Sequence, residues 1–131
     1  MLCGALPVLV AGCTGARVRY LTPIRQGEQL VISRIEIART GAALIEDPSS
    51  DLPIYLRRVT DTEFLAVSTR CGHRGCQVEP AAASLICPCH GSEYTFGGAI
   101  LQGPTERPLT RYRVTSDDVN VFVHLVSGDP R

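Results

Sequence analysis

Alternation of apolar and polar residues predicts short β-strands along most of the chain. In residues 28–37 the apolar side chains Leu30, Ile32 and Ile35 recur, imperfectly, with the two-residue period of a half-buried strand. Further strand candidates are residues 43–45, 54–59, 63–69, 84–86, 94–96, 99–101, 110–115 and 119–125. No long segment has the period of an amphipathic helix. Short strands at this spacing predict an all-β domain built as a small antiparallel sandwich or barrel.

Two of the strand pairs are expected to form hairpins. Gly97 and Gly98 separate residues 94–96 from 99–101, and adjacent glycines favour a tight turn between antiparallel strands. The last two candidates are expected to close the domain as a second hairpin. Four apolar residues would then share one face of the final strand: Val119, Val121, Val123 and Leu125.

Length and charge narrow the class of protein. The chain has 131 residues, which suits one domain with a modest core. It contains 13 basic and 13 acidic residues, so no broad basic surface is available to collect phosphates. Nucleic acid is therefore not an expected partner.

The first residues have the character of an export segment. Residues 1–13 are largely apolar and end in small residues, and they are too few to span a membrane as a helix. The tetrad Val10-Ala11-Gly12-Cys13 resembles a bacterial lipobox, which implies a lipid on the Cys13 thiol. We expect residues 1–16 to be the export and lipoprotein signal, and residues 17–131 to form the domain. An apolar tail is the alternative, because no basic residue precedes Arg17.

Two short motifs carry the candidate chemistry. They are Cys71-Gly72-His73-Arg74-Gly75-Cys76 and Cys87-Pro88-Cys89-His90-Gly91-Ser92. Each motif can offer one thiolate and one imidazole toward a shared point, which makes Cys71, His73, Cys87 and His90 the candidate metal ligands. Two Cys and two His could hold a tetrahedral zinc ion in a structural interaction module, although Cys76 and Cys89 would then have no role.

The motifs resemble the Rieske family, whose pattern is C-x-H-x-G-C followed by C-P-C-H-G-S. The resemblance implies a Rieske fold with a cluster-binding subdomain of two loops, about residues 70–106, and one [2Fe-2S] cluster per chain. It assigns two cysteines to one iron and two histidines to the other, and it pairs the remaining two cysteines in a disulfide. The residues concerned are Cys71 and Cys87, His73 and His90, and Cys76 and Cys89.

The same resemblance assigns roles around the cluster. Ser92 and Tyr94 match the two hydroxyls that hydrogen-bond to cluster sulfur in the high-potential branch and so raise the reduction potential. Pro104 lies in a Gly-Pro-Thr segment that resembles the loop covering the cluster, which implies that it shields the cluster from water. The potential would then lie within the range of about −150 to +300 mV found for Rieske centres.

The disulfide pair implies one branch of the Rieske family. Rieske ferredoxins of oxygenase systems generally lack it, whereas cytochrome bc, cytochrome b6f and arsenite oxidase small subunits have it. We therefore expect a protein that transfers one electron at a time from a quinol-linked or other redox enzyme to a cytochrome-like acceptor. It would act alone or as a subunit of an oxidoreductase complex, with no small-molecule substrate of its own. A Rieske ferredoxin of an oxygenase system is an alternative.

Location and partner choice are less closely constrained. We expect an exported protein at the periplasmic or outer face of the cytoplasmic membrane, held by the lipid on Cys13. Residues 17–29 would be a connector that lets the cluster move between partners. Arg74 and Thr95 depart from the cytochrome bc type, which usually has Leu and often Asp at these positions. Because Arg74 is charged, the sequence does not decide whether this loop docks into a quinol pocket. The third histidine, His124, falls in the last strand candidate and is expected to lie at the surface or packed against neighbours, without binding a metal.

Overall fold

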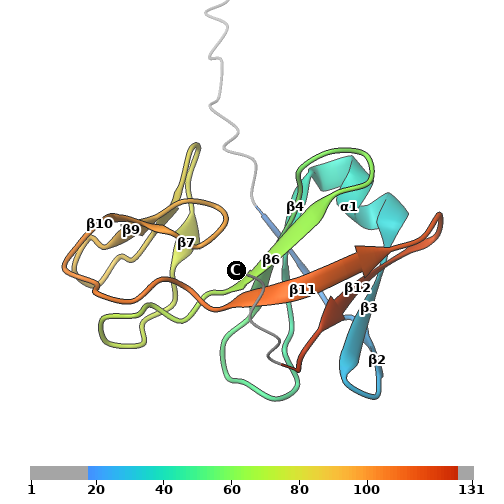
Figure 1. The fold of residues 1–131 in the computed structure, drawn as a ribbon, viewed down its shortest axis with the longest axis horizontal. Helices are drawn as coiled ribbons and strands as arrows, with labels where there is room; N and C mark the ends of the chain where they lie inside the picture. Colours follow the sequence, from blue (N-terminus) through green and yellow to red (C-terminus); the bar gives the residue numbers. More distant parts are fainter. Residues whose placement is uncertain (1–17, 127–131) are drawn as a thin grey trace, which may run out of the picture.

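A computed structural model describes residues 18–126, which form a large curled sheet with a smaller sheet beside it (Figure 1). The predicted signal segment and Cys13 lie outside the described residues. The large sheet has the strand order β1-β4-β5-β6-β11-β12-β3-β2. Its strands are β1 (Arg19–Leu21), β2 (Ile24–Gln26), β3 (Gln29–Ser33), β4 (Ala42–Ile45), β5 (Ile54–Arg58), β6 (Phe64–Ser68), β11 (Arg111–Ser116) and β12 (Asn120–His124). The small sheet contains β7 (Glu79–Pro80), β8 (Leu85–Ile86), β9 (Glu93–Tyr94) and β10 (Ile100–Gln102).

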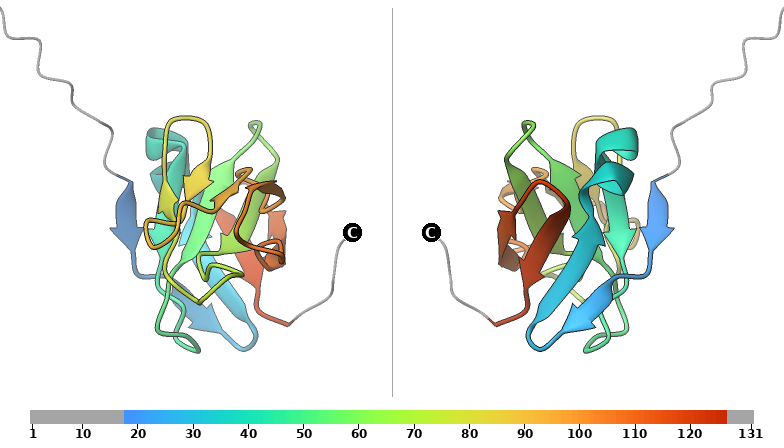
Figure 2. Two further views of the ribbon diagram at one scale, coloured as in Figure 1. Left: turned by 90° about the vertical axis from the view of Figure 1, so that its left-hand side faces the viewer. Right: turned by 90° about the vertical axis from the view of Figure 1, so that its right-hand side faces the viewer.

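The large sheet curls into a half-barrel (Figure 2). The strands β1 and β2 follow each other in the chain, yet they occupy the two opposite ends of the strand order. Only a strongly curled sheet can bring its two edges that close together. One strand pair departs from the expected antiparallel arrangement, because β1 pairs in parallel with β4 at one edge. All other strand pairs are antiparallel.

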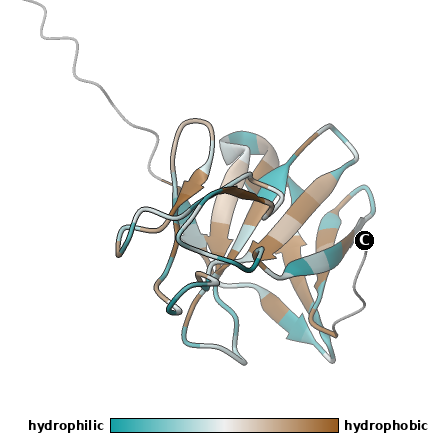
Figure 3. Ribbon diagram, turned by 60° about the vertical axis from the view of Figure 1, so that its left-hand side comes forward, coloured by the Kyte–Doolittle hydropathy of each residue, from teal (hydrophilic) through white to brown (hydrophobic). Residues whose placement is uncertain are grey.

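The concave face of the large sheet encloses the first hydrophobic core. Side chains that alternate along each strand face inward, as the two-residue period predicts, and the brown segments of Figure 3 mark such apolar strands. The fully buried members include Leu30, Ile37, Ala43, Ile45, Ile54, Leu56, Ala66, Val121 and Val123.

A second core lies on the opposite face of β4, β5 and β6. The intervening residues of these strands, among them Leu44, Tyr55 and Val67, pack there against the small sheet and its loops. Their partners from that side are Cys71, Val78, Leu85, Cys87, Tyr94 and Leu109. Both faces of the central strands are therefore buried, which explains why β4 and the first half of β5 are almost continuously apolar.

The strand expected over residues 28–37 is correct only in its first half. Helix α1 (Arg34–Thr40) follows β3 directly and ends at Gly41, whose N–H donates to the carbonyl of Ile37 and whose backbone is left-handed (φ 75°). The helix turns Ile37 into the first core and leaves Ile35 69% exposed. Within the part of the chain that is described, no helix is long and apolar enough to span a bilayer.

The closing hairpin is confirmed, with β11 antiparallel to β12, but its last strand starts later than expected. The Asp117 carboxylate accepts hydrogen bonds from the N–H groups of Val119 and Asn120, which makes this segment a turn. Val119 is consequently 66% exposed instead of sharing the buried face of Val121 and Val123.

The expected connector over residues 17–29 is also wrong. Residues 19–21 pair with β4, and residues 24–26 pair with β3. Because this segment forms both edges of the large sheet, it cannot act as a flexible tether between partners.

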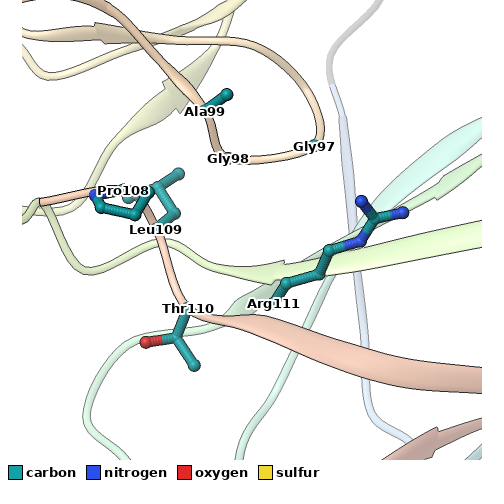
Figure 4. Close-up of a pocket in the computed structure, with 7 residues that line it drawn as sticks. All are labelled: Gly97, Gly98, Ala99, Pro108, Leu109, Thr110 and Arg111. Atoms are coloured by element: carbon teal, nitrogen blue, oxygen red, sulfur yellow. The ribbon is translucent and has the colours of Figure 1, made fainter. Parts of the chain in front are cut away.

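The small sheet joins the large one where the turn after β9 meets the segment that leads into β11. Figure 4 shows the loop of Gly97, Gly98 and Ala99 beside Pro108 and Leu109, and both segments line a cavity of about 470 Å³. The Leu109 N–H donates to the Gly98 carbonyl over 2.9 Å. Gly98 has φ 91°, and a Cβ there would lie 3.1 Å from Leu109, so the close approach requires glycine.

The two-core arrangement predicts a position-specific loss of stability. Replacing the fully buried Leu56 with Ala should lower the free energy of unfolding by about 2–5 kcal/mol, because it leaves a cavity in the first core. Replacing the exposed Val119 with Ala should change it by less than about 0.5 kcal/mol. Urea unfolding of the metal-loaded protein, followed by far-ultraviolet circular dichroism, measures both. Equal effects of the two substitutions would contradict the assignment of the core.

Candidate functional site

The two cysteine motifs form loops with the same backbone hydrogen bonds. In the first loop Cys71 donates its N–H to Cys76 and accepts from Gly75, over 2.8 and 3.0 Å. In the second loop Cys87 donates to Ser92 and accepts from Gly91, again over 2.8 and 3.0 Å. The left-handed glycines Gly75 and Gly91 (φ 77° and 79°) permit this turn in both loops. The repeated spacing of the motifs is thus a repeated loop geometry.

A disulfide between Cys76 and Cys89 joins the two loops, as the resemblance implied. The sulfur atoms of both residues lie within 4.8 Å of the Cys87 sulfur. The pair has no thiolate to offer a metal, so the disulfide removes these two cysteines from the set of possible ligands and holds the loops side by side.

The four remaining candidates divide into a buried pair and an exposed pair. The thiols of Cys71 and Cys87 are 3% and 1% exposed and belong to the second core. His73 and His90 are exposed, and their ring centroids lie 5.0 Å apart. Both loops therefore place sulfur toward the protein interior and imidazole toward solvent.

The spacing of these four side chains does not match a single metal ion. A tetrahedral zinc ion, with ligand distances of about 2.0–2.3 Å, would hold its ligand atoms within about 4 Å of one another. No three of these four residues have ligand atoms that all lie within 4.8 Å of one another. Two buried thiols and two exposed imidazoles, one of each from either loop, fit a two-iron cluster, in which the ligands are divided between two metals.

Tyr94 connects the second loop to the first. Its side chain is fully buried, and its hydroxyl oxygen accepts the Gly72 N–H over 3.0 Å. The same oxygen lies 3.3 Å from the Cys71 sulfur. Because the N–H of Gly72 occupies a lone pair, the hydroxyl proton is available to the sulfur.

The contact with Tyr94 helps to shift the pKa values of the two buried thiols in opposite directions. Burial acts to raise the pKa of Cys71, but hydrogen bonds from the Tyr94 hydroxyl and from backbone N–H groups outweigh it, so the pKa lies below its ordinary value. Burial raises the pKa of Cys87, and the neighbouring Cys71 adds to the rise. Burial also raises the pKa of Tyr94, and its hydrogen bond to Cys71 raises it further.

Ser92 has an equivalent arrangement through a residue that the sequence did not single out. Its fully buried hydroxyl accepts the Thr105 N–H over 3.0 Å, which leaves the hydroxyl proton free to donate. The Thr105 side chain in turn donates to the carbonyl of Arg107 over 3.0 Å. The only sequence signal for Thr105 was its place next to Pro104 in the covering loop.

With this geometry in view, the relatives of the chain can be compared. Residues 24–113 match the model of the Rieske [2Fe-2S] domain. The chain belongs to the Rieske [2Fe-2S] domain family. The matched region is longer than the resemblance in the motifs and includes β2, β3 and helix α1. This Rieske domain carries a [2Fe-2S] cluster, and the zinc-module alternative is not favoured.

Named relatives and solved structures agree with the assignment. The cytochrome b6-f complex iron-sulfur subunit of Chlorobaculum tepidum is 32% identical over 114 residues, which cover 82% of this chain and 62% of the relative. This Rieske domain thus spans about three fifths of the length of that curated relative. The plasma membrane Rieske protein of Synechocystis PCC 6803 has a TM-score of 0.60 and 26% identity, covering 70% of this chain and 97% of that one.

The fold itself is shared more widely. The ferredoxin of carbazole 1,9a-dioxygenase from Nocardioides aromaticivorans has a TM-score of 0.56 at 21% identity, covering 79% of this chain and 98% of that one. At this identity the likeness concerns the fold alone. The all-β Rieske fold predicted from the motifs is therefore confirmed, with the addition of helix α1.

Two further predicted residues have clear positions. Pro104 is exposed and lines a cavity of about 380 Å³ together with Gly72 and His73. His124 lies away from the loops in β12, where its two ring nitrogens contact Thr115 and Gln29 at 2.9 and 3.4 Å. Burial lowers the pKa of His124, and the charge of Arg113 lowers it further. The expectation of a surface or packed position for His124 agrees with these contacts.

The tight packing of the first loop predicts a selective glycine requirement. A Cβ at Gly72 would lie 2.4 Å from the Arg107 carbonyl oxygen, whereas a Cβ at Gly97 would meet nothing closer than 3.8 Å. Gly72→Ala should therefore displace the loop, lower the free energy of unfolding by about 1–3 kcal/mol and reduce the iron bound per chain. Gly97→Ala is the matched control and should bind the normal amount. Full iron content in both variants would contradict the prediction.

Proposed function

We propose that this Rieske domain transfers single electrons from a quinol-linked or other redox enzyme to a cytochrome-like acceptor, through a cluster held by Cys71, His73, Cys87 and His90. When bound, the cluster supplies one-electron oxidation and reduction. The observation that carries the proposal is the division of the four side chains into two buried thiols and two exposed imidazoles on disulfide-linked loops.

The division gives each pair of side chains a separate task. Cys71 and Cys87 would present their sulfur atoms to one iron from inside the second core, where hydrogen bonds to the Cys71 sulfur replace water. His73 and His90 present their rings at the surface, with centroids 5.0 Å apart, and so provide the shortest route for an electron to a docked partner. Pro104, beside His73, limits the access of water to that side.

According to this proposal, the buried hydroxyls of Tyr94 and Ser92 raise the reduction potential of the cluster. The Tyr94 hydroxyl lies 3.3 Å from the Cys71 sulfur and can donate its proton there, because its oxygen accepts the Gly72 N–H. The Ser92 oxygen accepts the Thr105 N–H in the same way, so its proton is also free to donate. A hydrogen bond to sulfur stabilises the more negative reduced state and therefore raises the reduction potential. Both residues would place this Rieske domain in the high-potential branch.

We also propose that the protein works at the outer face of the cytoplasmic membrane, anchored by a lipid on Cys13. The names of its relatives support the membrane location, since they are a cytochrome b6-f complex subunit and a plasma membrane Rieske protein. The proposal of a lipid anchor is based on the lipobox-like tetrad of residues 10–13. Arg74 is exposed on the first loop, so the docking surface around His73 carries a positive charge that an acidic partner surface would complement.

The ligand assignment is tested by separating the three histidines. His90→Ala should abolish the electron paramagnetic resonance signal of the reduced Rieske cluster, because one iron loses a ligand. His124→Ala is the matched control and should keep the signal, since His124 lies in β12 among side-chain partners. Metal analysis should find two irons per chain in the native protein. A colourless native protein with one zinc ion per chain would overturn the proposal.

The role of Tyr94 is tested by a redox titration. Tyr94→Phe removes only the hydroxyl and should lower the midpoint potential by about 40 mV, the equivalent of about 1 kcal/mol for one electron. Ser92→Ala should also lower it. Tyr112→Phe, on β11, is the control and should leave it unchanged. A Tyr94→Phe protein with an intact cluster and an unaltered potential would exclude this role for Tyr94.

A further inference from the structure

Three arginines line a large cavity on the side of the molecule where the chain enters the fold. They come from separate elements: Arg19 from β1, Arg39 from the last turn of α1 and Arg57 from β5. The cavity has a volume of about 740 Å³ and lies between these elements and the turn that links β7 to β8. It shares no lining residue with the two cysteine loops.

The positive charge of this cavity is not neutralised by neighbouring carboxylates. Among residues 18–126, no Asp or Glu lines it. The ion pairs found between described residues are Arg58 with Asp61 and Arg70 with Asp51, and none of the three cavity arginines takes part. The whole chain has equal numbers of basic and acidic residues, so this grouping of three arginines is local. The site is therefore suited to an anion.

One of the guanidinium groups is held in place before any ligand arrives. Arg57 stacks over the ring of Phe96, with its guanidinium carbon 4.0 Å from the ring centroid. It also donates to the Tyr55 hydroxyl over 3.2 Å, and Tyr55 itself stacks on Phe96 with centroids 5.9 Å apart. An oriented guanidinium fork matches the paired oxygens of a phosphate group and loses little side-chain entropy on binding.

Apart from Thr40 and Tyr55, the remaining wall of the cavity is apolar. It is formed by Ala42 of β4 and by Pro80, Ala81 and Ala82 at the β7–β8 turn, with Val18 at the entrance of the chain. A small inorganic anion would make no use of such a wall. A phosphodiester attached to glycerol and acyl carbons can place its charge on the arginines and its carbon chain along the alanines.

The place of the cavity in the chain indicates the source of this ligand. Val18 lines the cavity and follows Cys13 by five residues. Five residues of extended chain span at most about 18 Å. A lipid on Cys13 would therefore hold this side of the domain close to a bilayer. This step rests on the membrane location put forward under the proposed function.

We propose that the three-arginine cavity binds the headgroup phosphate of an anionic phospholipid and so orients the Rieske domain on the membrane surface. The turn of the β7–β8 hairpin lines the cavity. Cys87 follows directly after β8, at the end of the hairpin opposite the turn. Docking of the turn side against lipid directs the loops with His73 and His90 away from the bilayer, toward partners in the aqueous phase.

The experiment measures binding of the full, cluster-loaded chain to vesicles. Cys13→Ser is introduced throughout, so that a covalent lipid does not dominate partitioning. Co-sedimentation is compared for vesicles of phosphatidylcholine alone and vesicles with 30 mol% phosphatidylglycerol. We expect binding to the anionic vesicles only, and a loss of about fivefold for each of Arg19→Gln and Arg39→Gln, because one cation near an anionic surface contributes about that factor. Both side chains are exposed, so neither substitution should disturb folding.

Matched controls decide between a site and a diffuse charge effect. Arg113→Gln removes one exposed positive charge from β11, far along the strand order from β1, and should reduce binding less than twofold. An equal loss in Arg113→Gln, equal binding to neutral vesicles, or no binding to either would each overturn the proposal. Competition by inorganic phosphate at low millimolar concentration would also overturn it, because it would assign the cavity to a free anion. The cluster spectrum of each variant shows that the fold is retained.

Failure of this inference can be told apart from failure of the proposed function. A colourless protein would contradict the proposed function. Mass spectrometry of the native protein that finds no lipid on Cys13 would contradict the proposed anchor. Loss of selectivity for anionic vesicles, in a protein with an intact cluster, would remove only the headgroup site.

Discussion

The burial of both faces of β4, β5 and β6 is the constraint on which the rest of this Rieske domain depends. One face closes the half-barrel, and the other supports the second core, to which Cys71 and Cys87 belong. The site therefore does not sit on a loop that could move independently of the fold. Its inner wall is part of the packing of the large sheet, so the position of the thiols is fixed by the same apolar contacts that stabilise the domain.

Within that setting, backbone N–H groups arrange the polar part of the site. Gly72 donates to Tyr94, and Thr105 donates to Ser92. Each contact joins two segments that are distant in sequence, and each leaves the hydroxyl proton free to donate. Fully buried hydroxyls are tolerated because every one of them is hydrogen-bonded, and none of the described buried side-chain polar atoms lacks a partner.

The small sheet separates two kinds of surface. Its β7–β8 hairpin leads at one end into the loop of Cys87 and at the other into a turn beside three arginines. Redox chemistry and anion binding would therefore occupy opposite ends of one rigid element. The incorporation of residues 19–26 into the large sheet strengthens this view, because motion of the domain as a whole would have to come from outside the described residues.

Features that depend on a local pattern of residues could be predicted from the amino-acid sequence. The two-residue period located most strands, and the spacing of Cys and His within two short motifs identified the candidate ligands and the family, because each motif is a self-contained turn whose chemistry is fixed by neighbouring residues. Tertiary structure alone decided the parallel pairing of β1, the change from strand to helix after Ser33, the part played by Thr105 and the meeting of Arg19, Arg39 and Arg57. These features join residues that are far apart in the chain. Their contacts depend on how the sheet curls and in which register its strands pair, and a local pattern of apolar and polar residues contains no record of either.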